Sequence, residues 1–473
     1  MRGLERGLGP RLGLPTPGDA ETRPAARPNK RPIWLHGASV GESLSALALA
    51  RLLAERCPGQ DFLITSGTVD GIDVVRKRIG CAGLSPCGFV AGSESRVTCL
   101  QAPVDLPCAV WAFRRRWQPS ALLVIEADLW PSMLVQCSQT GIPLVLVDGR
   151  MSERSAGRWG SWLLKPLMAY LLARFDLVLC QSAADESRLR TLGASKARCI
   201  GSIKGAAGPL PVNTDTVKAV HEALNGHACG AASAAYLGRC QRRVWLAAST
   251  HEKEEELVAI AHHQVLADTH RTHEVQDFGF QSASLQTHPA AVRPLLVIIP
   301  RHPRRCVQVV EMLAKLQPNW SVVMYTKMTS ISMLASTDVL VVDVLGVMGD
   351  WYSIADVALV GGSLVDGIGG HNVMEAAQLG CVPLHGPFNE NGQHLIDALR
   401  SIDATCIQQV SSPAQLAAAV LTVMRPVRGE RGETRGCGPL QSAARAAAKQ
   451  VSHRTCIKLA AAVTDSLIAA KAL

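Results

Sequence analysis

The chain has 473 residues, of which 48% are hydrophobic and 18% are charged, and its net charge is +9 at neutral pH. This length exceeds one ordinary hydrophobic core, so two domains are expected, and the composition excludes a disordered chain. Residues 1–210 hold 26 Lys and Arg against 17 Asp and Glu, so the first half carries the whole positive excess. An anionic partner is expected there. Only 4% of residues are aromatic and no RNA-binding motif occurs, which argues against nucleic acid.

Residues 1–30 are rich in arginine and contain no serine. We interpret them as an N-terminal extension that either targets the protein or is disordered. No apolar run approaches the roughly 18 residues that a membrane-spanning helix needs. The 15 cysteines form no C-x-x-C pair, so no metal site is predicted.

The first half alternates apolar runs with helical patterns, which is typical of a parallel sheet in an α/β domain. Residues 43–59 are the clearest helix, because one face is apolar and Pro58-Gly59 ends it. The predicted strands are 32–38, 60–66, 120–126, 142–148 and 175–181.

A second series of strands follows a stretch, 211–241, that lacks this rhythm and is predicted to be a linker with an insertion. Ser249-x-x-Glu252 resembles a capping box, and the Ala-rich tail is predicted to be helical. We therefore predict two Rossmann-like domains that face a cleft, 31–210 and 242–473. Residues 266–293 and 426–441 are predicted surface insertions. The strands of the second series are 243–250, 294–300, 320–326, 338–344, 356–362 and 381–387.

Ligands of open α/β sheets bind beyond the carboxyl ends of the strands, and two acids of the first half lie there. Glu42 belongs to HGASVGES, directly after the first strand. An acid in the first turn of a helix is ordinary, since the helix dipole stabilises it, but it could also act as a general base. Glu126 ends the strand LLVIE, where a carboxylate has few structural reasons to be, so structure and function are equally good explanations.

The second half has a stronger signal in GGSLVDGIGGHNVMEAAQLG, which places glycines, His371 and Asn372 before a helix that contains Glu375. Glycine amides and a helix N-terminus suit a phosphate, and Glu375 could accept hydrogen bonds from a ribose. Arg301 follows another strand and could add a positive charge at the same phosphate. Its neighbours His302, Arg304 and Arg305 are predicted to be solvated.

These segments resemble the family of 3-deoxy-D-manno-octulosonic acid (Kdo) transferases. The similar stretches, in family order over about residues 31–390, include RPIWLHGASVGES, LLVIEADLWPSML, IPLVLVDGRMSERS, FDLVLCQSAADESRL, WLAASTHEKEEEL, IPRHPRR, MGDWYSIADVALVGGSL and GGHNVMEAAQLG. The resemblance implies a GT-B fold and an inverting transfer of Kdo from CMP-Kdo to a lipid A precursor at a membrane surface. It also implies that neither a metal ion nor another cofactor is needed.

The resemblance assigns Glu42 as the general base, flanked on the acceptor side by Ser39, Gly41 and Glu126. It assigns a second group of residues to the nucleotide sugar: Lys204, Arg301, Met348, Gly349, Gly361, Gly362, Ser363, His371, Asn372 and Glu375.

Some segments depart from the family pattern, notably GSIKGAAG at 201–208, Asp350 where a glutamate is usual, and FNENGQH at 388–394. Two alternatives therefore stay open, namely another GT-B enzyme (a UDP-sugar transferase or an epimerase) and an inactive relative that binds nucleotide or lipid. HNVMEAAQLGCV is closer to plant and algal versions than to bacterial ones. This favours a peripheral mitochondrial enzyme, with the cytoplasmic face of a bacterial inner membrane as the alternative location.

Overall fold

The computed structural model describes residues 31–79, 87–89, 95–126, 129–206, 208–225, 242–277, 293–425 and 438–473. The chain divides into two compact units. Unit 1 comprises residues 1–207 and 452–473, and unit 2 comprises residues 208–451. The predicted extension 1–30 and most of the predicted insertion, 226–241, lie outside the described residues. Among the helices that the structure describes, none has the length and apolarity to cross a bilayer.

Unit 1 contains an eight-stranded sheet in the order β3-β4-β2-β1-β5-β6-β7-β8, parallel except for the β3–β4 pair. Side chains alternate between its two faces: Ile33 and Leu35 pack in one apolar cluster, and Trp34 packs in the other. The strands are β1 Ile33–Gly37, β2 Phe62–Ser66, β3 Cys87–Phe89, β4 Arg96–Gln101, β5 Ala121–Ile125, β6 Leu144–Gly149, β7 Leu177–Cys180 and β8 Ala197–Cys199.

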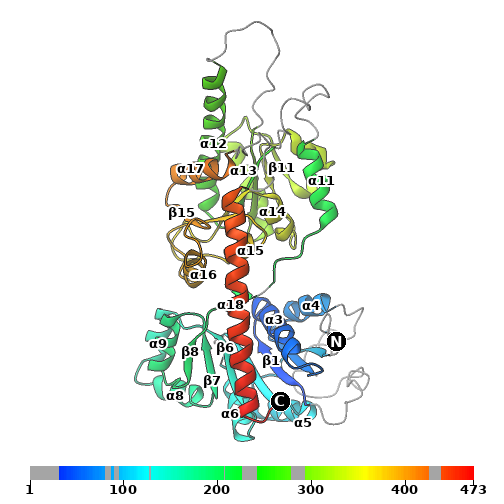
Figure 1. Cartoon of the computed structure of the whole chain (residues 1–473), viewed down its shortest axis with the longest axis vertical. Coiled ribbons are helices and arrows are strands. Elements are labelled where there is room, and N and C mark those ends of the chain that lie inside the picture. The colour runs from blue at the N-terminus through cyan, green and yellow to red at the C-terminus, as the bar shows by residue number, and fades with distance from the viewer. Residues whose placement is uncertain are drawn as a thin grey trace. The chain divides into compact units, whose positions relative to one another are not determined.

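Helices cover both faces of this sheet (Figure 1). The helix predicted at 43–59 forms as α3, Val40–Arg56, and buries Leu47, Leu49 and Leu53 against β1. The other helices are α4 Val69–Arg78, α5 Pro107–Trp117, α6 Pro131–Gln139, α7 Glu153–Trp159, α8 Lys165–Leu172, α9 Ala183–Thr191 and α10 Ile203–Ala206.

Unit 2 contains a seven-stranded sheet, parallel throughout, in the order β11-β12-β10-β9-β13-β14-β15. All six strands predicted for this half are present, so the prediction of two α/β domains is confirmed. The strands are β9 Val244–Thr250, β10 Leu295–Pro300, β11 Val322–Met324, β12 Val339–Val341, β13 Val357–Val360, β14 Val382–His385 and β15 Gln408–Gln409.

The helices of unit 2 again pack on both faces of the sheet. They are α11 Thr214–Asn225, α12 Glu254–Asp277, α13 Cys306–Leu316, α14 Met348–Ile354, α15 Met374–Gln378, α16 Gln393–Arg400 and α17 Pro413–Met424, with short 3-10 turns η2 Pro303–Arg305, η3 Tyr325–Lys327 and η4 Ile331–Ala335. Helix α18, Pro439–Ala469, begins in unit 2 and ends in unit 1.

Three predictions about the organisation of the chain are wrong. The predicted linker contains α11, whose Val220 and Leu224 are buried in the core of unit 2. The predicted insertion 266–293 is helical as far as Asp277, because α12 continues, and residues 278–292 lie outside the described part. Residues 452–473 belong to unit 1, since Leu459, Val463 and Leu467 pack in its core. Of the predicted insertion 426–441, residues 426–437 lie outside the described residues.

Candidate functional site

Glu42 lies in the first turn of α3, where Ser39 is the N-cap. The Ser39 hydroxyl accepts a hydrogen bond from the Glu42 amide at 3.3 Å and donates one to the Glu42 carboxylate at 2.8 Å. The same carboxylate accepts the Ala38 amide at 2.7 Å. This reciprocal cap holds the carboxylate in one orientation at the N-terminus of the helix.

The surface beside Glu42 is open. Ser39 and Gly41 are exposed, and a Cβ atom built on Gly41 would come no closer than 4.0 Å to another group, the Ser39 hydroxyl. Packing therefore does not require glycine at position 41. A small residue here leaves room for a bulky molecule to approach the half-buried Glu42.

Glu126 follows β5 with a φ of +61°, and Asp148, in the adjacent strand β6, has a φ of +62°. These values are rare for residues other than glycine and cost of order 1–3 kcal/mol each. The Glu126 carboxylate forms an ion pair with Lys204 at 2.5 Å. Lys204 was predicted on the nucleotide side, but it lies in unit 1 beside the predicted acceptor-side acid.

Asp148 holds the turn that carries Lys204. Its buried carboxylate accepts the Ile203 amide at 2.8 Å and the Ser202 hydroxyl at 3.3 Å, and Gln181 donates to it at 2.8 Å. Burial raises the pKa of Asp148 to about 6, although the Lys204 charge and the Ile203 amide oppose this. Asp148 was not among the predicted site residues, although it ends the predicted strand 142–148 just as Glu126 ends the strand 120–126.

A pocket of about 480 Å³ in unit 1 brings Glu42 and Glu126 together. Arg150 and Arg158 supply positive charge to its wall. The remaining wall is mainly apolar and includes Leu129, Trp159, Leu167, Met168 and Leu171. The pocket thus combines two carboxylates, two cations and an apolar surface, which suits an amphipathic molecule that carries both hydroxyl and anionic groups.

In unit 2, the glycine loop after β13 is occupied by a side chain of the protein. The carboxylate of Glu254 is fully buried and accepts the Gly362 amide at 2.7 Å. It also accepts the amides of Ser363 at 3.0 Å and Leu364 at 2.9 Å. The expectation that these amides donate to a ligand phosphate is wrong for this structure, because Glu254 takes them. Gly361 contributes by its smallness, since a Cβ there would lie 2.9 Å from the Glu254 carboxylate.

The predicted capping box at Ser249 and Glu252 is wrong. Helix α12 begins at Glu254 itself, and the Glu254 carboxylate accepts the His251 amide at 3.0 Å. Ser249 has a φ of +55°. The acid that caps this turn is therefore the same one that holds the glycine loop 108 residues away.

His251 meets His371 of the loop after β13. Their Nε2 atoms are 2.9 Å apart and the rings are stacked, with centroids 5.2 Å apart and an interplanar angle of 15°. Burial, His251 and the Arg301 charge lower the pKa of His371 to about 4. Burial is also the main cause that lowers the pKa of His251. Arg301 is exposed beside this pair, so one face of unit 2 collects two imidazoles and a guanidinium.

Asn372 and Glu375 form a hydrogen bond with one another. The Asn372 amide donates to Glu375 at 3.2 Å, and its oxygen accepts the Met374 amide at 3.1 Å. The helix that follows, α15, has only five residues. A helix this short has only a weak dipole to stabilise a phosphate.

Met348 and Gly349 have a structural explanation. They begin α14, and a Cβ on Gly349 would lie 2.2 Å from the carbonyl oxygen of Pro211. The neighbouring Asp350 accepts the Asn213 amide at 2.6 Å, so this turn fastens the start of α11. Asp350, which is one methylene shorter than the residue usual in the family, thus makes a specific contact.

Arg305 is not a solvated neighbour of Arg301, as was predicted. It is half-buried and donates to the buried carboxylate of Glu255 at 2.8 and 3.4 Å. Arg301, by contrast, is exposed, and its charge lowers the pKa of both histidines.

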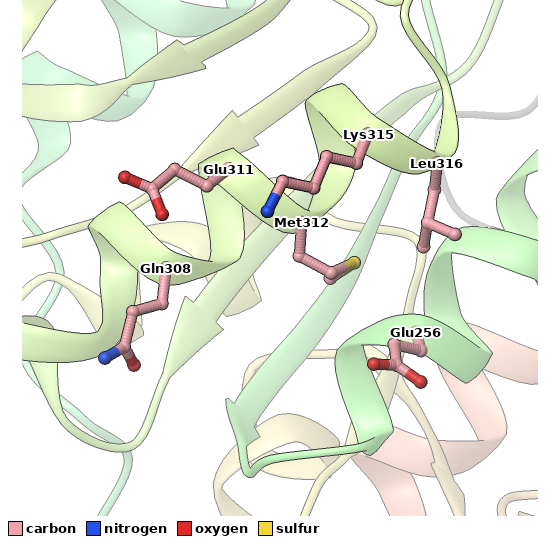
Figure 2. A pocket seen from close by; sticks show the side chains of 6 residues that line it. All are labelled: Glu256, Gln308, Glu311, Met312, Lys315 and Leu316. Carbon is pink, nitrogen blue, oxygen red and sulfur yellow. The ribbon is translucent and has the colours of Figure 1, made fainter.

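A second hollow of about 280 Å³ lies between α12 and α13. Figure 2 shows that Glu256 faces Met312, Lys315 and Leu316 across it. None of the predicted site residues lines this hollow, and we assign no chemistry to it.

Comparison with known proteins decides the family. A family model described as 3-deoxy-D-manno-octulosonic-acid transferase (kdotransferase) matches residues 6–207. The 3-deoxy-D-manno-octulosonic acid transferase of Bordetella pertussis is 31% identical over 368 residues, which cover 78% of this chain and 74% of that protein. This chain belongs to the Kdo transferase family. It is therefore an enzyme, a glycosyltransferase.

A plant relative resembles the chain over a longer stretch. The probable mitochondrial 3-deoxy-D-manno-octulosonic acid transferase of Arabidopsis thaliana is 29% identical over 398 residues, covering 84% of this chain and 78% of that protein. Among solved structures, a glycosyltransferase from Rickettsia africae ESF-5 aligns with a TM-score of 0.54 at 10% identity, covering 93% of this chain and 99% of that one. The two parallel sheets of this Kdo transferase, one in each unit, are thus those of a GT-B fold.

Proposed function

We propose that this Kdo transferase moves Kdo from CMP-Kdo to a hydroxyl of a lipid A precursor, with Glu42 as the general base. Glu42 takes the proton from the acceptor hydroxyl, whose oxygen attacks the anomeric carbon of Kdo. The bond from that carbon to the phosphate oxygen breaks, and CMP leaves from the opposite face, so the configuration inverts. The observation that carries the proposal is that Glu42 and Glu126 line one pocket with two arginines.

The contacts of Glu42 support its role. The Ser39 hydroxyl and the Ala38 amide hold its carboxylate in one orientation, and a general base must be held within reach of the proton it takes. Glu126 is paired with Lys204, so its charge is already partly balanced. We therefore give Glu126 and Lys204 the role of positioning the acceptor.

The walls of the pocket support a phosphorylated lipid as the acceptor. Arg150 and Arg158 would pair with its phosphates, and the apolar wall would contact its hydrophobic part. Met168 and Leu171 of this wall are buried. Trp162 and Leu163 are 87% and 67% exposed, however, so we propose that they enter a membrane surface.

Unit 2 would hold the donor. Arg301 and His371 would contact the phosphate, and Asn372 and Glu375 would contact the ribose. A single phosphate diester carries one negative charge, which a guanidinium and protein donors can stabilise as it leaves, so we propose that no metal ion is required. The likeness to a plant relative named as mitochondrial supports a mitochondrial location.

The direct test is a transfer assay with purified full-length protein, CMP-Kdo generated in place, and tetraacylated lipid A precursor. Kdo-modified lipid should form. When EDTA is added together with the lipid, after CMP-Kdo has accumulated, it should not reduce the rate of transfer. In parallel, thermal shifts with CMP and with UDP separate the alternatives. Protection by UDP alone would favour a UDP-sugar enzyme, and protection by CMP without any transfer would favour an inactive relative.

A further inference from the structure

His251 and His371 form an unusual pair at the proposed donor site. A hydrogen bond of 2.9 Å between two Nε2 atoms requires that one ring carries the proton and the other accepts it. The rings are also stacked nearly parallel, at 15°. The hydrogen bond couples the two rings. What one histidine does with a proton therefore depends on the other.

The pair can accept one additional proton without breaking. An imidazolium still donates through Nε2 to the lone pair of a neutral imidazole, so a singly charged pair keeps the 2.9 Å contact. Two charged rings could not keep it, because two N–H groups would then face each other. The pair is thus built to hold either zero or one positive charge.

Without a bound anion, the surroundings of the two histidines favour the neutral state of the pair. Arg301 lies beside both rings, and His302 and Arg305 add to the positive field at His251. The nearby acid is Glu254, whose carboxylate already accepts four backbone amides. Burial opposes charge on both rings. A bound anion beside Arg301 and His371 would offset the positive charges nearby and would make protonation of the pair more favourable.

We propose that His251 and His371 act as one proton-sharing unit that takes up a single proton when the phosphate of the donor binds beside Arg301. This rests on the proposed function and extends it, because His251 becomes a positioning residue and binding of the donor becomes linked to pH. Glu254 sets the geometry, since its carboxylate joins the amide of His251 to the loop that leads to His371.

The test measures the dissociation constant of the methyl ester of CMP, a diester whose single charge does not titrate near neutral pH. Calorimetry on the full-length protein at about pH 7.5 and about pH 5.5 should show tighter binding at the lower pH, by at most about tenfold per pH unit for one linked proton. Buffers with different ionisation enthalpies should report proton uptake on binding. Cytidine, which lacks the phosphate, should bind without proton uptake.

The variants His251→Gln and His371→Gln should each abolish the proton uptake, because glutamine can replace the hydrogen bond but cannot take a proton. His302→Gln, the same change at the exposed neighbour, is the matched control and should retain it. Urea unfolding of each variant checks the fold, and the asparagine variant replaces any glutamine variant that unfolds. If His251→Gln still takes up a proton when the methyl ester binds, the proposal that the two histidines share that proton is contradicted.

The outcomes separate this inference from the proposed function. If the methyl ester binds equally well at both pH values, the proton-sharing unit is wrong, while donor binding stands. If neither CMP nor its methyl ester binds at either pH, both proposals are contradicted.

Discussion

Three carboxylates of this Kdo transferase differ in what donates to them. Glu254 is buried and receives four amides, so its capacity to accept hydrogen bonds is used within the protein. Glu42 receives one amide and one hydroxyl and lines a pocket. Asp148 is buried, and its pKa is raised to about 6, because three donors and the Lys204 charge do not fully replace water. A carboxylate thus fixes a loop at Glu254, is the proposed general base at Glu42, and supports a turn at Asp148.

Asp148 should make the stability of unit 1 depend on pH. Its folded pKa of about 6 lies above the ordinary value of an aspartate, so the folded state binds more protons and stability falls as pH rises from about 4 to about 6. In the variant Asp148→Asn, the side chain does not titrate, so this fall in stability with rising pH should disappear. Relative to wild type, the variant should gain about 2–3 kcal/mol of unfolding free energy over that range, as measured by urea titration at several pH values.

A difference between the two proteins that stays constant from about pH 4 to about pH 6 would contradict the assigned pKa. Glu153→Gln, an exposed change in the same unit, should show no such trend and serves as the control.

Sequence reasoning could find Glu42 because its signal is local: a strand, small residues and an acid within one stretch of eight. It could not find the role of Glu254, whose partners Gly362, Ser363 and Leu364 lie more than 100 residues away and are brought to it only by the order β9-β13 in the sheet. The pairing of His251 with His371 was hidden for the same reason.

Among the elements, the turn that begins α3 links stability to the proposed chemistry. Ser39 both caps the helix and donates to Glu42. Strands could be predicted from continuous apolar runs, because a strand buried on both faces needs them. The strands β3, β4, β8 and β15 were missed. β4, Arg96–Gln101, mixes polar and apolar residues, and the other three are edge strands, which are less apolar: β15 is Gln408–Gln409, and both residues are exposed.

Ser39→Ala should cost about 1 kcal/mol of unfolding free energy, as for other N-caps, and should also lower the transfer rate because Glu42 loses an orienting bond. Ser412→Ala removes the corresponding cap of α17 in unit 2 and is the matched control. It should cost a similar free energy and leave the rate unchanged. Equal rates for the two variants would show that the cap matters for folding alone.

For the whole molecule, the main departure from prediction is the end of the chain. An Ala-rich tail predicts a helix but not which core the helix joins, because alanine carries little information about its partner. The tail forms α18, and Leu459, Val463 and Leu467 from its last turns pack with Leu47 and Ile33 of unit 1. Unit 1 is therefore completed by residues that follow unit 2 in the sequence.

Leu467→Ala should destabilise unit 1 by about 2–5 kcal/mol, because it removes a fully buried side chain. Its neighbour Ile468 is 60% exposed, so Ile468→Ala is the matched control and should change stability by less than about 0.5 kcal/mol. Thermal unfolding of both variants measures the difference. Similar melting temperatures for the two would contradict the packing of α18 in unit 1.

The most direct test of the central claim compares transfer and CMP binding in Glu42→Gln. Glutamine keeps the size and an acceptor oxygen but cannot act as a base, so the turnover number should fall by about 10²–10⁴. The dissociation constant of CMP should stay within about twofold of wild type. Asp70→Asn, an exposed change in the first turn of α4, should preserve both. Turnover by Glu42→Gln at the wild-type rate would contradict the assignment of Glu42 as the catalytic base.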